Sequence, residues 1–414
     1  MSISIIPNLS KLHTKAIFLF AVLMLCLPGA AMADKVTDWN LIAHTAENNI
    51  AGRANGFVFV DLAYMHIAMY DAVNAIDHRY TTFAVTPTTV PAGASKEAAV
   101  IEAGYRVFRA IIPSSQWAYV DAQYALSLSS IPDGPSKEDG KAVGAEVAAL
   151  FLVSRAGDGR GNPAITYVPS SGPGAWIPTP PNFPSAATPW LAVMRPFAIK
   201  SPSQFRADPP PALDSAEYAV DFDETRRLGS LNSSERSPEQ TELARFFLDN
   251  SAQTGRTIRG VAADHDLDLD DAARFYALVY VSEADSWIAG WDSKLFFGFW
   301  RPITAIRATV DTNWTALTNT PGHPEYPSAH AFQTASYSEA FRQLLGTKHL
   351  SVTLTSNITG TTRTYDNTDD LLKDVADARV FAGFHFRTSC VRGGIIGKKV
   401  AKYVAKNYFL PLEK

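Results

Sequence analysis

The sequence is poor in cysteine, which excludes a fold held together by disulfide bonds. Only two of its 414 residues are cysteines, Cys26 and Cys390. Cys26 lies in an N-terminal segment that we expect to be removed, so a single thiol remains and no internal disulfide can form. A chain of this length, 46% of it hydrophobic, can instead bury a core large enough to stabilise itself.

The chain also lacks the features by which many proteins bind nucleic acids or cross membranes. Its formal net charge is -4, so no basic surface for a nucleic acid is predicted. After residue 33, no apolar run is long enough to span a bilayer. The zinc-binding spacings H-x-x-x-H and H-E-x-x-H, a glycine-rich phosphate loop and a nucleophile elbow are missing too. These absences exclude several large classes of hydrolases and nucleotide-binding enzymes.

The first 33 residues are predicted to be a secretory signal peptide. Lys11 and Lys15 precede the apolar run AIFLFAVLMLCL, and the segment ends in AMA before Asp34. A positively charged start, a short apolar run and an A-x-A ending are the three parts of such a signal. We therefore expect cleavage after Ala33 and an exported protein, periplasmic or secreted, without a stable membrane anchor.

The mature chain has the hydrophobic periodicity of an all-α fold. In SKEAAVIEAGYRVFRAIIP apolar residues recur every three or four positions, with Ser95 placed to cap a helix and Pro113 to end it. SKEDGKAVGAEVAALFLVS has the same period, and Ser136 and Asp139 form a candidate capping pair. YMHIAMYDAVNAI is almost wholly apolar, which predicts a buried central helix. His66 within it is expected to be a hydrogen-bonded core residue.

A proline-rich stretch divides the helical patterns. Residues 163–211 hold 13 of the 26 prolines, which excludes a regular helix or a central strand there. Trp176, Phe183, Trp190 and Phe197 are the expected apolar anchors of this ordered crossing.

We therefore expect an N-terminal helical half over residues 34–162, a connector over 163–212 and a C-terminal helical half over 213–414. The alternating β-branched residues of SVTLTSNITGTTRTYD predict a small β-hairpin in the C-terminal half.

One later segment places two cations in apolar surroundings. In WDSKLFFGFWRPITAIR, Lys294 and Arg301 are seven residues apart and separated only by apolar residues and glycine. On a helix this spacing puts both on one face. Buried cations need an anion, so the segment predicts an anion-binding site. Pro302 disfavours the α conformation at Arg301, which we expect near a helix end.

Two further segments contain histidines. In HPEYPSAHAF a helix that begins after Ser328 would direct the free N–H groups of Ala329 and His330 outward, as in an anion-binding helix terminus. In RVFAGFHFR, Arg379 and His385 are six residues apart. That spacing leaves them about 120° apart on a regular helix, so they converge only if Gly383 loosens the helix or the arginine reaches round.

Taken together, K-x6-R-P, P-S-A-H and R-x5-H resemble the signature of the vanadium-dependent haloperoxidases and type-2 phosphatidic acid phosphatases. FWRPITAIR, HPEYPSAH, AGFHFR and the early AYMHIAMYDAVNAID are similar to the secreted bacterial haloperoxidase-like branch of that superfamily. The resemblance covers nearly the whole mature chain. It implies an all-α fold of helical bundles, with an oxyanion site inside one of them.

The resemblance also implies a role for each site residue. The cations Lys294, Arg301 and Arg379 would bind the oxygens of vanadate or phosphate. The Ser328 hydroxyl and the backbone N–H of Ala329 would bind further oxygens. His385 would bond to the central atom, and His330 would act as acid and base. Trp291 and His323 would lie near the halide, and a histidine at the place of His323 favours bromide or iodide over chloride.

Three functions are compatible with these residues. The first is a vanadate-dependent haloperoxidase that uses hydrogen peroxide to oxidise a halide to hypohalous acid. The second is a soluble periplasmic acid phosphatase that cleaves phosphate monoesters through a phosphohistidine, without vanadate. The third is a non-catalytic oxyanion-binding helical protein. Ala329 replaces the family's usual glycine and Ser389 replaces a common aspartate, so we expect a crowded pocket unless φ of Ala329 is ordinary, and a less well oriented His385. The sequence predicts no oligomeric state.

Overall fold

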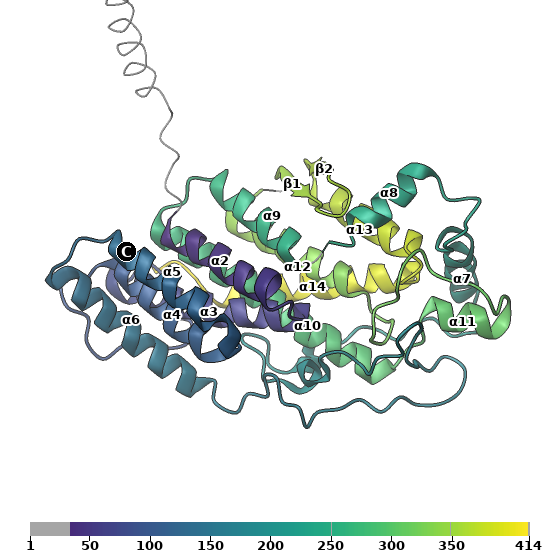
Figure 1. Ribbon diagram of the computed structural model, residues 1–414, viewed down its shortest axis with the longest axis horizontal. Coiled ribbons are helices and arrows are strands. Elements are labelled where there is room, and N and C mark those ends of the chain that lie inside the picture. Colours follow the sequence, from purple (N-terminus) through teal and green to yellow (C-terminus); the bar gives the residue numbers. More distant parts are fainter. Residues whose placement is uncertain (1–33, 250, 348, 413–414) are drawn as a thin grey trace, which may run out of the picture. The chain divides into compact units, whose positions relative to one another are not determined.

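Helices make up most of the part of the chain that the structure, a computed structural model, describes: residues 34–412 without 250 and 348 (Figure 1). The predicted all-α fold is confirmed, whereas the predicted signal peptide lies outside the described residues. The α-helices are α2 (Lys35–His44), α3 (Asn55–Asp77), α4 (Lys96–Ile111), α5 (Trp117–Ser129), α6 (Pro135–Ser154), α7 (Ala216–Leu228), α8 (Pro238–Phe246), α9 (Ser251–Ala263), α10 (Leu269–Phe297), α11 (Pro302–Thr309), α12 (Ala329–Leu345), α13 (Thr368–Phe381) and α14 (Arg387–Asn407).

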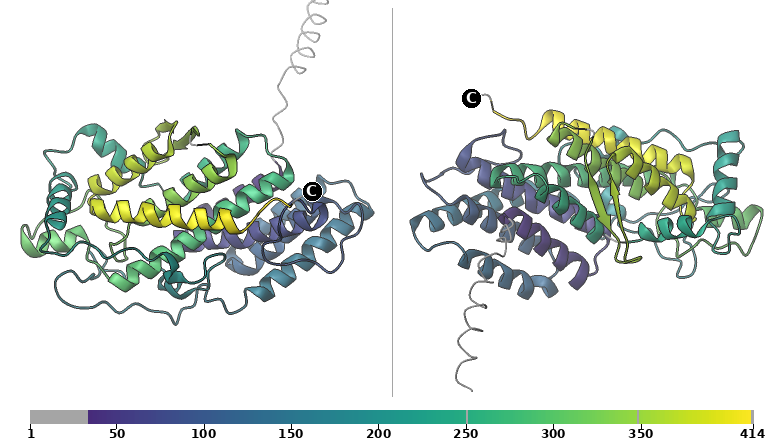
Figure 2. Two further views of the ribbon diagram at one scale, coloured as in Figure 1. Left: turned by 180° about the vertical axis from the view of Figure 1, so that it is seen from behind. Right: turned by 90° about the horizontal axis from the view of Figure 1, so that it is seen from above.

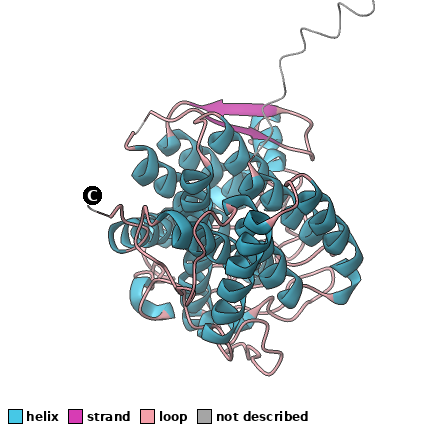
Figure 3. Cartoon of the chain, turned by 90° about the vertical axis from the view of Figure 1, so that its left-hand side faces the viewer, coloured by secondary structure: helices cyan, strands magenta, loops and turns pink. Residues whose placement is uncertain are grey.

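Short elements complete the fold. They are a π-helix, η1 (Thr45–Ile50), three 3-10 helices, η2 (Ser114–Gln116), η3 (Pro189–Val193) and η4 (Pro202–Phe205), and the strands β1 (Val352–Thr355) and β2 (Thr362–Tyr365). The strands pair antiparallel with Val352 opposite Tyr365, which confirms the predicted hairpin. Figure 3 shows the hairpin on the outside of the helices.

Helix α3 is a buried core helix, as its uniform apolarity predicts. The prediction that no segment after residue 33 could span a bilayer is wrong for α3, which is long and apolar enough to cross a membrane. However, 94% of its most apolar window is buried inside the protein. His66 in its middle is stacked against the rings of both Tyr276 and Tyr280, each 5.0 Å away. The amide nitrogen of Asn40 lies 2.9 Å from its Nε2. The prediction of a hydrogen-bonded core histidine is confirmed.

The two neighbouring helices α4 and α6 begin differently. The Ser95 hydroxyl caps α4 by accepting the N–H of Ala98, as predicted. The capping pair predicted for α6 is wrong, because Pro135 occupies the first helical position and sets the start itself. Ser136 is therefore already inside the helix, where its hydroxyl donates to the Gly93 carbonyl.

The proline-rich connector crosses the helices without regular structure apart from η3 and η4, as predicted. Its Trp176 and Trp190 are buried, but Phe183 is 62% exposed, so the prediction that Phe183 anchors the connector is wrong. A buried carboxylate also fixes this segment. Asp285 on α10 accepts the consecutive backbone N–H groups of residues 197–199 at 2.7–2.9 Å.

Helix α10 is the central element. It packs against α3 on one side and against α12 and α14 on the other, and Figures 1 and 2 show α12 and α14 running alongside each other. Residues from Lys35 onward belong to one compact unit. Helix α10 contacts elements of both proposed halves. The division into two helical halves and a connector therefore does not correspond to separate compact units, and it stays a prediction.

Candidate active site

The two cations of the first motif lie on either side of a helix end. Helix α10 stops at Phe297, and Gly298 takes the left-handed conformation with φ 53°. Arg301 then has extended backbone angles and precedes α11. The prediction that Lys294 and Arg301 share one helix face is therefore wrong, although Arg301 does lie at a helix boundary as Pro302 predicted. Both side chains are fully buried.

Arg301 joins two loops through its guanidinium. Its Nε donates to the His323 carbonyl at 2.9 Å, and one terminal nitrogen lies 3.0 Å from His323 Nδ1. The other terminal nitrogen donates to the Phe384 carbonyl at 2.9 Å and lies 3.2 Å from His385 Nε2. One arginine thus holds the loop before α12 next to the turn before α14.

Lys294 reaches the same loop from the end of α10. Its Nζ donates to the carbonyls of Pro324 and Glu325, both at 2.9 Å. The Trp291 ring lies one helical turn earlier, 5.8 Å from Nζ and 5.1 Å from the His323 ring. The structure therefore brings Trp291, His323 and Lys294 together.

The PSAH motif lies at the start of α12. Ser328 is the N-cap residue, and its buried hydroxyl has no hydrogen-bond partner in the described chain. Ala329 begins the helix and is not among the residues with positive φ, so its methyl group causes no backbone strain. His330 follows in the first turn, whose N–H groups lack intrahelical acceptors. This arrangement suits an anion at the helix terminus.

Arg379 and His385 converge because their helix ends between them. Helix α13 stops at Phe381, and Gly383 follows with φ 75°, so the first of the two alternatives is correct. Both residues are buried. One terminal nitrogen of Arg379 donates to the Phe247 carbonyl at 2.8 Å, while its buried Nε has no partner in the described chain.

Glu325 is the site residue that the sequence reasoning missed. It is fully buried, and its Oε1 lies 2.9 Å from His385 Nδ1 and accepts the N–H of Phe386 at 3.0 Å. Ser389, which replaces the family's aspartate, is 3.5 Å from the same Nδ1. The carboxyl group at the His385 end thus comes from the loop before α12 and not from α14. The sequence clue was an acidic residue between His323 and Ser328 in an otherwise apolar loop.

These contacts determine which nitrogen of His385 carries the proton. A guanidinium only donates hydrogen bonds, so Nε2 facing Arg301 must be an acceptor. A carboxylate only accepts, so Nδ1 facing Glu325 carries the hydrogen. The Nε2 lone pair therefore points towards the cations. A metal ligand and a nucleophile both require this tautomer.

The electrostatics keep the histidines neutral. Burial, and then the charges of nearby Arg301 and Lys294, hold the pKa of His385 well below 6.5. Burial and the charge of Arg379 do the same to the pKa of His330, which is partly exposed. Burial raises the pKa of Glu325 to about 7, although Arg301 and Lys294 oppose that shift.

The buried charges of the site do not balance. Arg301 keeps its proton at neutral pH, because burial lowers its pKa only to about 9, and Arg379 does so with a pKa of about 10. Burial and Arg301 lower the pKa of Lys294 well below 10.5, and Glu325 supplies the negative charge that acts on Lys294 and Arg301. An oxyanion would offset this excess of positive charge. Its oxygens would also find the Ser328 hydroxyl and the Arg379 Nε, so the residues present fit vanadate or phosphate.

The space beside His330 is small. The cavity has a volume of about 20 Å³ and is otherwise lined mainly by polar residues of α9, α12 and the segment before α9, among them Ser251, Thr254 and Gln333. Such a volume holds about one water molecule. Cys390 is buried, and burial raises its pKa to about 12, so the thiol near His385 is shielded and unreactive.

Known proteins resemble this chain in sequence and in fold. Residues 274–412, which contain the site residues named above apart from Phe247 and those of α9, match the VCPO second helical-bundle domain. In this part the chain is similar to the vanadium chloroperoxidases. A curated relative, the vanadium chloroperoxidase of Curvularia inaequalis, is 27% identical over 277 residues, which cover 53% of this chain and 46% of that protein. The match thus spans about half of the relative's length.

Solved structures of the superfamily share the fold over almost the whole chain. The structure described as the first bacterial vanadium-dependent iodoperoxidase aligns with a TM-score of 0.79 at 21% identity, covering 92% of this chain and 97% of that one. A holo bacterial vanadium-dependent chloroperoxidase aligns with a TM-score of 0.72 at 17% identity, covering 90% of this chain and 97% of that one.

Proposed function

We propose that this protein is a vanadate-dependent haloperoxidase that oxidises bromide or iodide with hydrogen peroxide to the hypohalous acid. The observation that carries the proposal is the buried cluster of Lys294, Arg301 and Arg379 around the unprotonated Nε2 of His385. These cations outnumber the one carboxyl group, that of Glu325, whose charge opposes theirs in this part of the described chain. The relatives are named for chloride and iodide oxidation, which supports the reaction class.

Each residue has a defined task in this proposal. The two arginines and Lys294 would bind the oxygens of the anion, because a guanidinium makes paired, charge-assisted hydrogen bonds. His385 would bond to vanadium through Nε2 while Glu325 holds its Nδ1 proton. Bound vanadate would supply the Lewis acidity that activates hydrogen peroxide towards halide.

His330 would take up and return the peroxide proton. Its pKa is held low by burial and by the three cations, and an anion bound among those cations would raise this pKa towards neutrality. A group with a pKa near the working pH is the most effective general acid and base. The small cavity beside His330 admits a molecule the size of water.

The halide preference is proposed from the neighbourhood of His323. Its ring lies against Trp291 and is held by Arg301, so a halide there would meet one indole, one imidazole and a guanidinium. Comparing initial rates with chloride, bromide and iodide at equal concentration tests this part. Faster turnover of chloride than of bromide would contradict it.

Two assays test the activity itself. The purified protein loaded with orthovanadate should oxidise iodide when peroxide is added, and the vanadate-free protein should not hydrolyse an aryl phosphate. The reverse pattern would identify an acid phosphatase, and silence in both assays a binding protein. His385→Ala should abolish halide oxidation, whereas the matched variant His265→Ala, at an exposed position, should leave it unchanged.

Export of the mature chain is part of the same proposal. N-terminal sequencing of protein recovered from the periplasm or the medium should begin at Asp34. A product that retains residues 1–33 would contradict it.

A further inference from the structure

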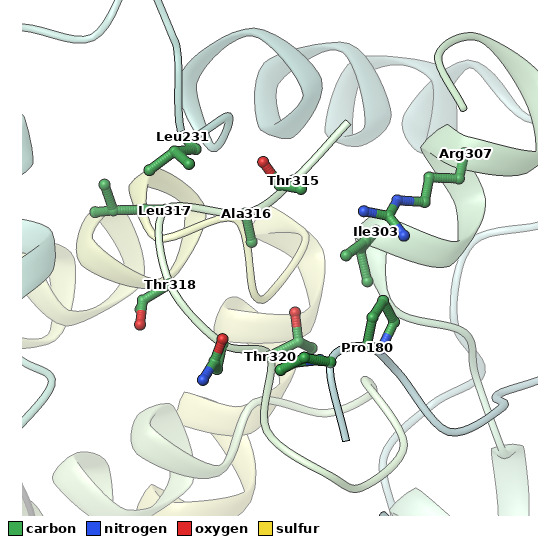
Figure 4. A pocket seen from close by; sticks show the side chains of 11 residues that line it. Pro180, Leu231, Ile303, Arg307, Thr315, Ala316, Leu317, Thr318 and Thr320 are labelled. Carbon is green, nitrogen blue, oxygen red and sulfur yellow. The ribbon is translucent and has the colours of Figure 1, made fainter. Parts of the chain in front are cut away.

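A second cavity lies against the segment that leads into the active site. It has a volume of about 330 Å³ and is bounded by α11, residues 315–320 and Pro180 of the connector (Figure 4). Of its eleven lining residues, Arg307 is the one charged side chain. Figure 4 shows the Arg307 guanidinium and the Thr320 hydroxyl directed into the space between these elements. None of these groups belongs to the oxyanion site.

Arg307 is fixed in place by one hydrogen bond, and its guanidinium has further N–H donors. Its Nε donates to the Trp314 carbonyl at 2.7 Å, which anchors the side chain. A guanidinium has five N–H donors. No acidic residue lines the cavity, and within residues 34–412, leaving out 250 and 348, Arg307 forms no ion pair. The charge that faces the cavity is therefore not neutralised by a neighbouring carboxylate of the described chain.

Thr320 provides an independent indication of a ligand. It is only 8% exposed, and its Oγ1 is buried with no hydrogen-bond partner in the described chain. A buried hydroxyl without a partner costs folding free energy, so native proteins usually satisfy it. A ligand oxygen in the cavity would supply the missing acceptor.

The remaining wall is mostly apolar. Ile303, Leu231, Leu317 and Pro180 line the cavity together with small and hydroxylated side chains. Apolar walls with a few convergent polar groups are typical of small-molecule sites, and about 330 Å³ is at the lower end of their size range.

We propose that this cavity binds a small organic carboxylate with an apolar body, such as an aromatic monocarboxylate. The carboxylate would pair with the planar fork of Arg307 and accept the Thr320 hydroxyl, while the apolar body contacts Ile303 and Leu317. This binding site goes beyond the proposed activity and does not depend on it.

The site is coupled by contact to the turn that carries His385. Leu317 in its wall donates its N–H to the Ala382 carbonyl at 3.2 Å. A Cβ placed on Gly383 would lie 3.1 Å from the Cβ of Ala316, another wall residue. A bound carboxylate therefore rests on a segment that is in direct contact with the residues just before His385.

Benzoate is the probe that tests the proposal, with benzamide as its neutral isostere. Ligand-observed NMR is performed in saturating phosphate, which occupies the oxyanion site. Benzoate should bind with a dissociation constant on the order of 1 mM, and benzamide at least about tenfold more weakly. Arg307→Gln should weaken benzoate about tenfold or more, and the isosteric Thr320→Val several-fold without loss of thermal stability.

The matched control is Arg245→Gln, which removes an exposed arginine on α8 and should leave benzoate affinity unchanged. Displacement of benzoate by phosphate would assign it to the oxyanion site and overturn the proposal. Equal affinity for benzamide, or full binding by Arg307→Gln and Thr320→Val, would overturn it as well. Because neither vanadate nor peroxide is present, these outcomes are independent of halide oxidation.

Discussion

At the scale of single residues, Glu325 is the centre of the site's electrostatics. It joins His385 Nδ1 to the loop that Lys294 and Arg301 hold through backbone carbonyls. The carboxyl group missing at Ser389 is thereby supplied by a residue 60 positions before His385. The site keeps an oriented histidine although the common aspartate is absent.

Glu325→Gln should change how anion binding depends on pH. With its pKa of about 7, Glu325 loses its negative charge as the pH falls through neutrality, so the wild type should bind sulfate more tightly at about pH 6 than at about pH 8. The variant lacks the charge at any pH. It should bind sulfate more tightly than the wild type at about pH 8, and its affinity should vary less.

Isothermal titration with sulfate, whose own charge is constant in this range, measures the effect. The control Glu235→Gln, at an exposed position, should behave like the wild type. An unchanged pH dependence in Glu325→Gln would show that another group controls it.

Ala329→Gly tests the other departure from the family. Because Ala329 has an ordinary φ at the start of α12, glycine should lower the free energy of unfolding by about 1 kcal/mol. The backbone N–H survives, so sulfate affinity should stay within about twofold. Urea unfolding and titration measure both quantities, and an affinity gain above about tenfold would mean that the methyl group obstructs the pocket.

At the scale of elements, the site depends on two helix ends. Gly298 stops α10 and Gly383 follows α13, both with positive φ. These turns bring the Arg301 guanidinium within 3.2 Å of His385 Nε2. Helical spacing had instead predicted Arg301 on the same helix face as Lys294, and His385 about 120° from Arg379. Helix termini, more than helix faces, position the cations and histidines.

Gly383→Ala should destabilise the protein and impair the site together. The left-handed conformation costs an alanine about 1–2 kcal/mol, and its Cβ would lie 2.5 Å from the Gly229 carbonyl oxygen. In contrast, Gly394→Ala inside α14 meets nothing within 4 Å and should stabilise the helix by about 0.5–1 kcal/mol. Thermal unfolding and sulfate titration of both variants check this, and equal stability of the two would refute the role of the turn.

The elements were predicted better from the sequence than the contacts between them. Periodicity and capping correctly predicted α4 with its Ser95 cap, the buried α3 and the hairpin, because these depend on neighbouring residues. The capping prediction for α6 failed because Pro135 sets the start of that helix. The role of Glu325 could not be predicted, because it arises only when the loop before α12 meets the turn before α14. The prediction that Phe183 is a buried anchor failed for a similar reason, because its burial depends on tertiary packing that the sequence pattern does not reveal.

At the scale of the whole molecule, buried histidines should make stability depend on pH. Burial lowers the pKa of His66 to about 3, below the unfolded value of about 6.5. The unfolded chain therefore takes up a proton that the folded protein refuses once the pH falls below about 6.5. The contribution of His66 to stability is present above that pH and is lost on acidification, by up to about 1.4 kcal/mol per pH unit.

His66→Gln isolates this contribution, because all other groups are shared with the wild type. The cost of the substitution, from urea unfolding, should be greatest near pH 8 and should shrink steadily towards pH 4. A cost that stays constant over this range would mean that His66 takes up a proton as readily in the folded protein as in the unfolded chain.

Helix α10 connects the buried core to the active site. Its middle packs on α3 and carries Asp285, and its last turn carries Lys294. A loss of packing at the core end would therefore move the lysine at the other end. Under this arrangement the active site should have no unfolding transition of its own. Heat should inactivate the enzyme at the temperature at which the whole unit unfolds. Residual activity after heating would then measure the folded fraction of the protein.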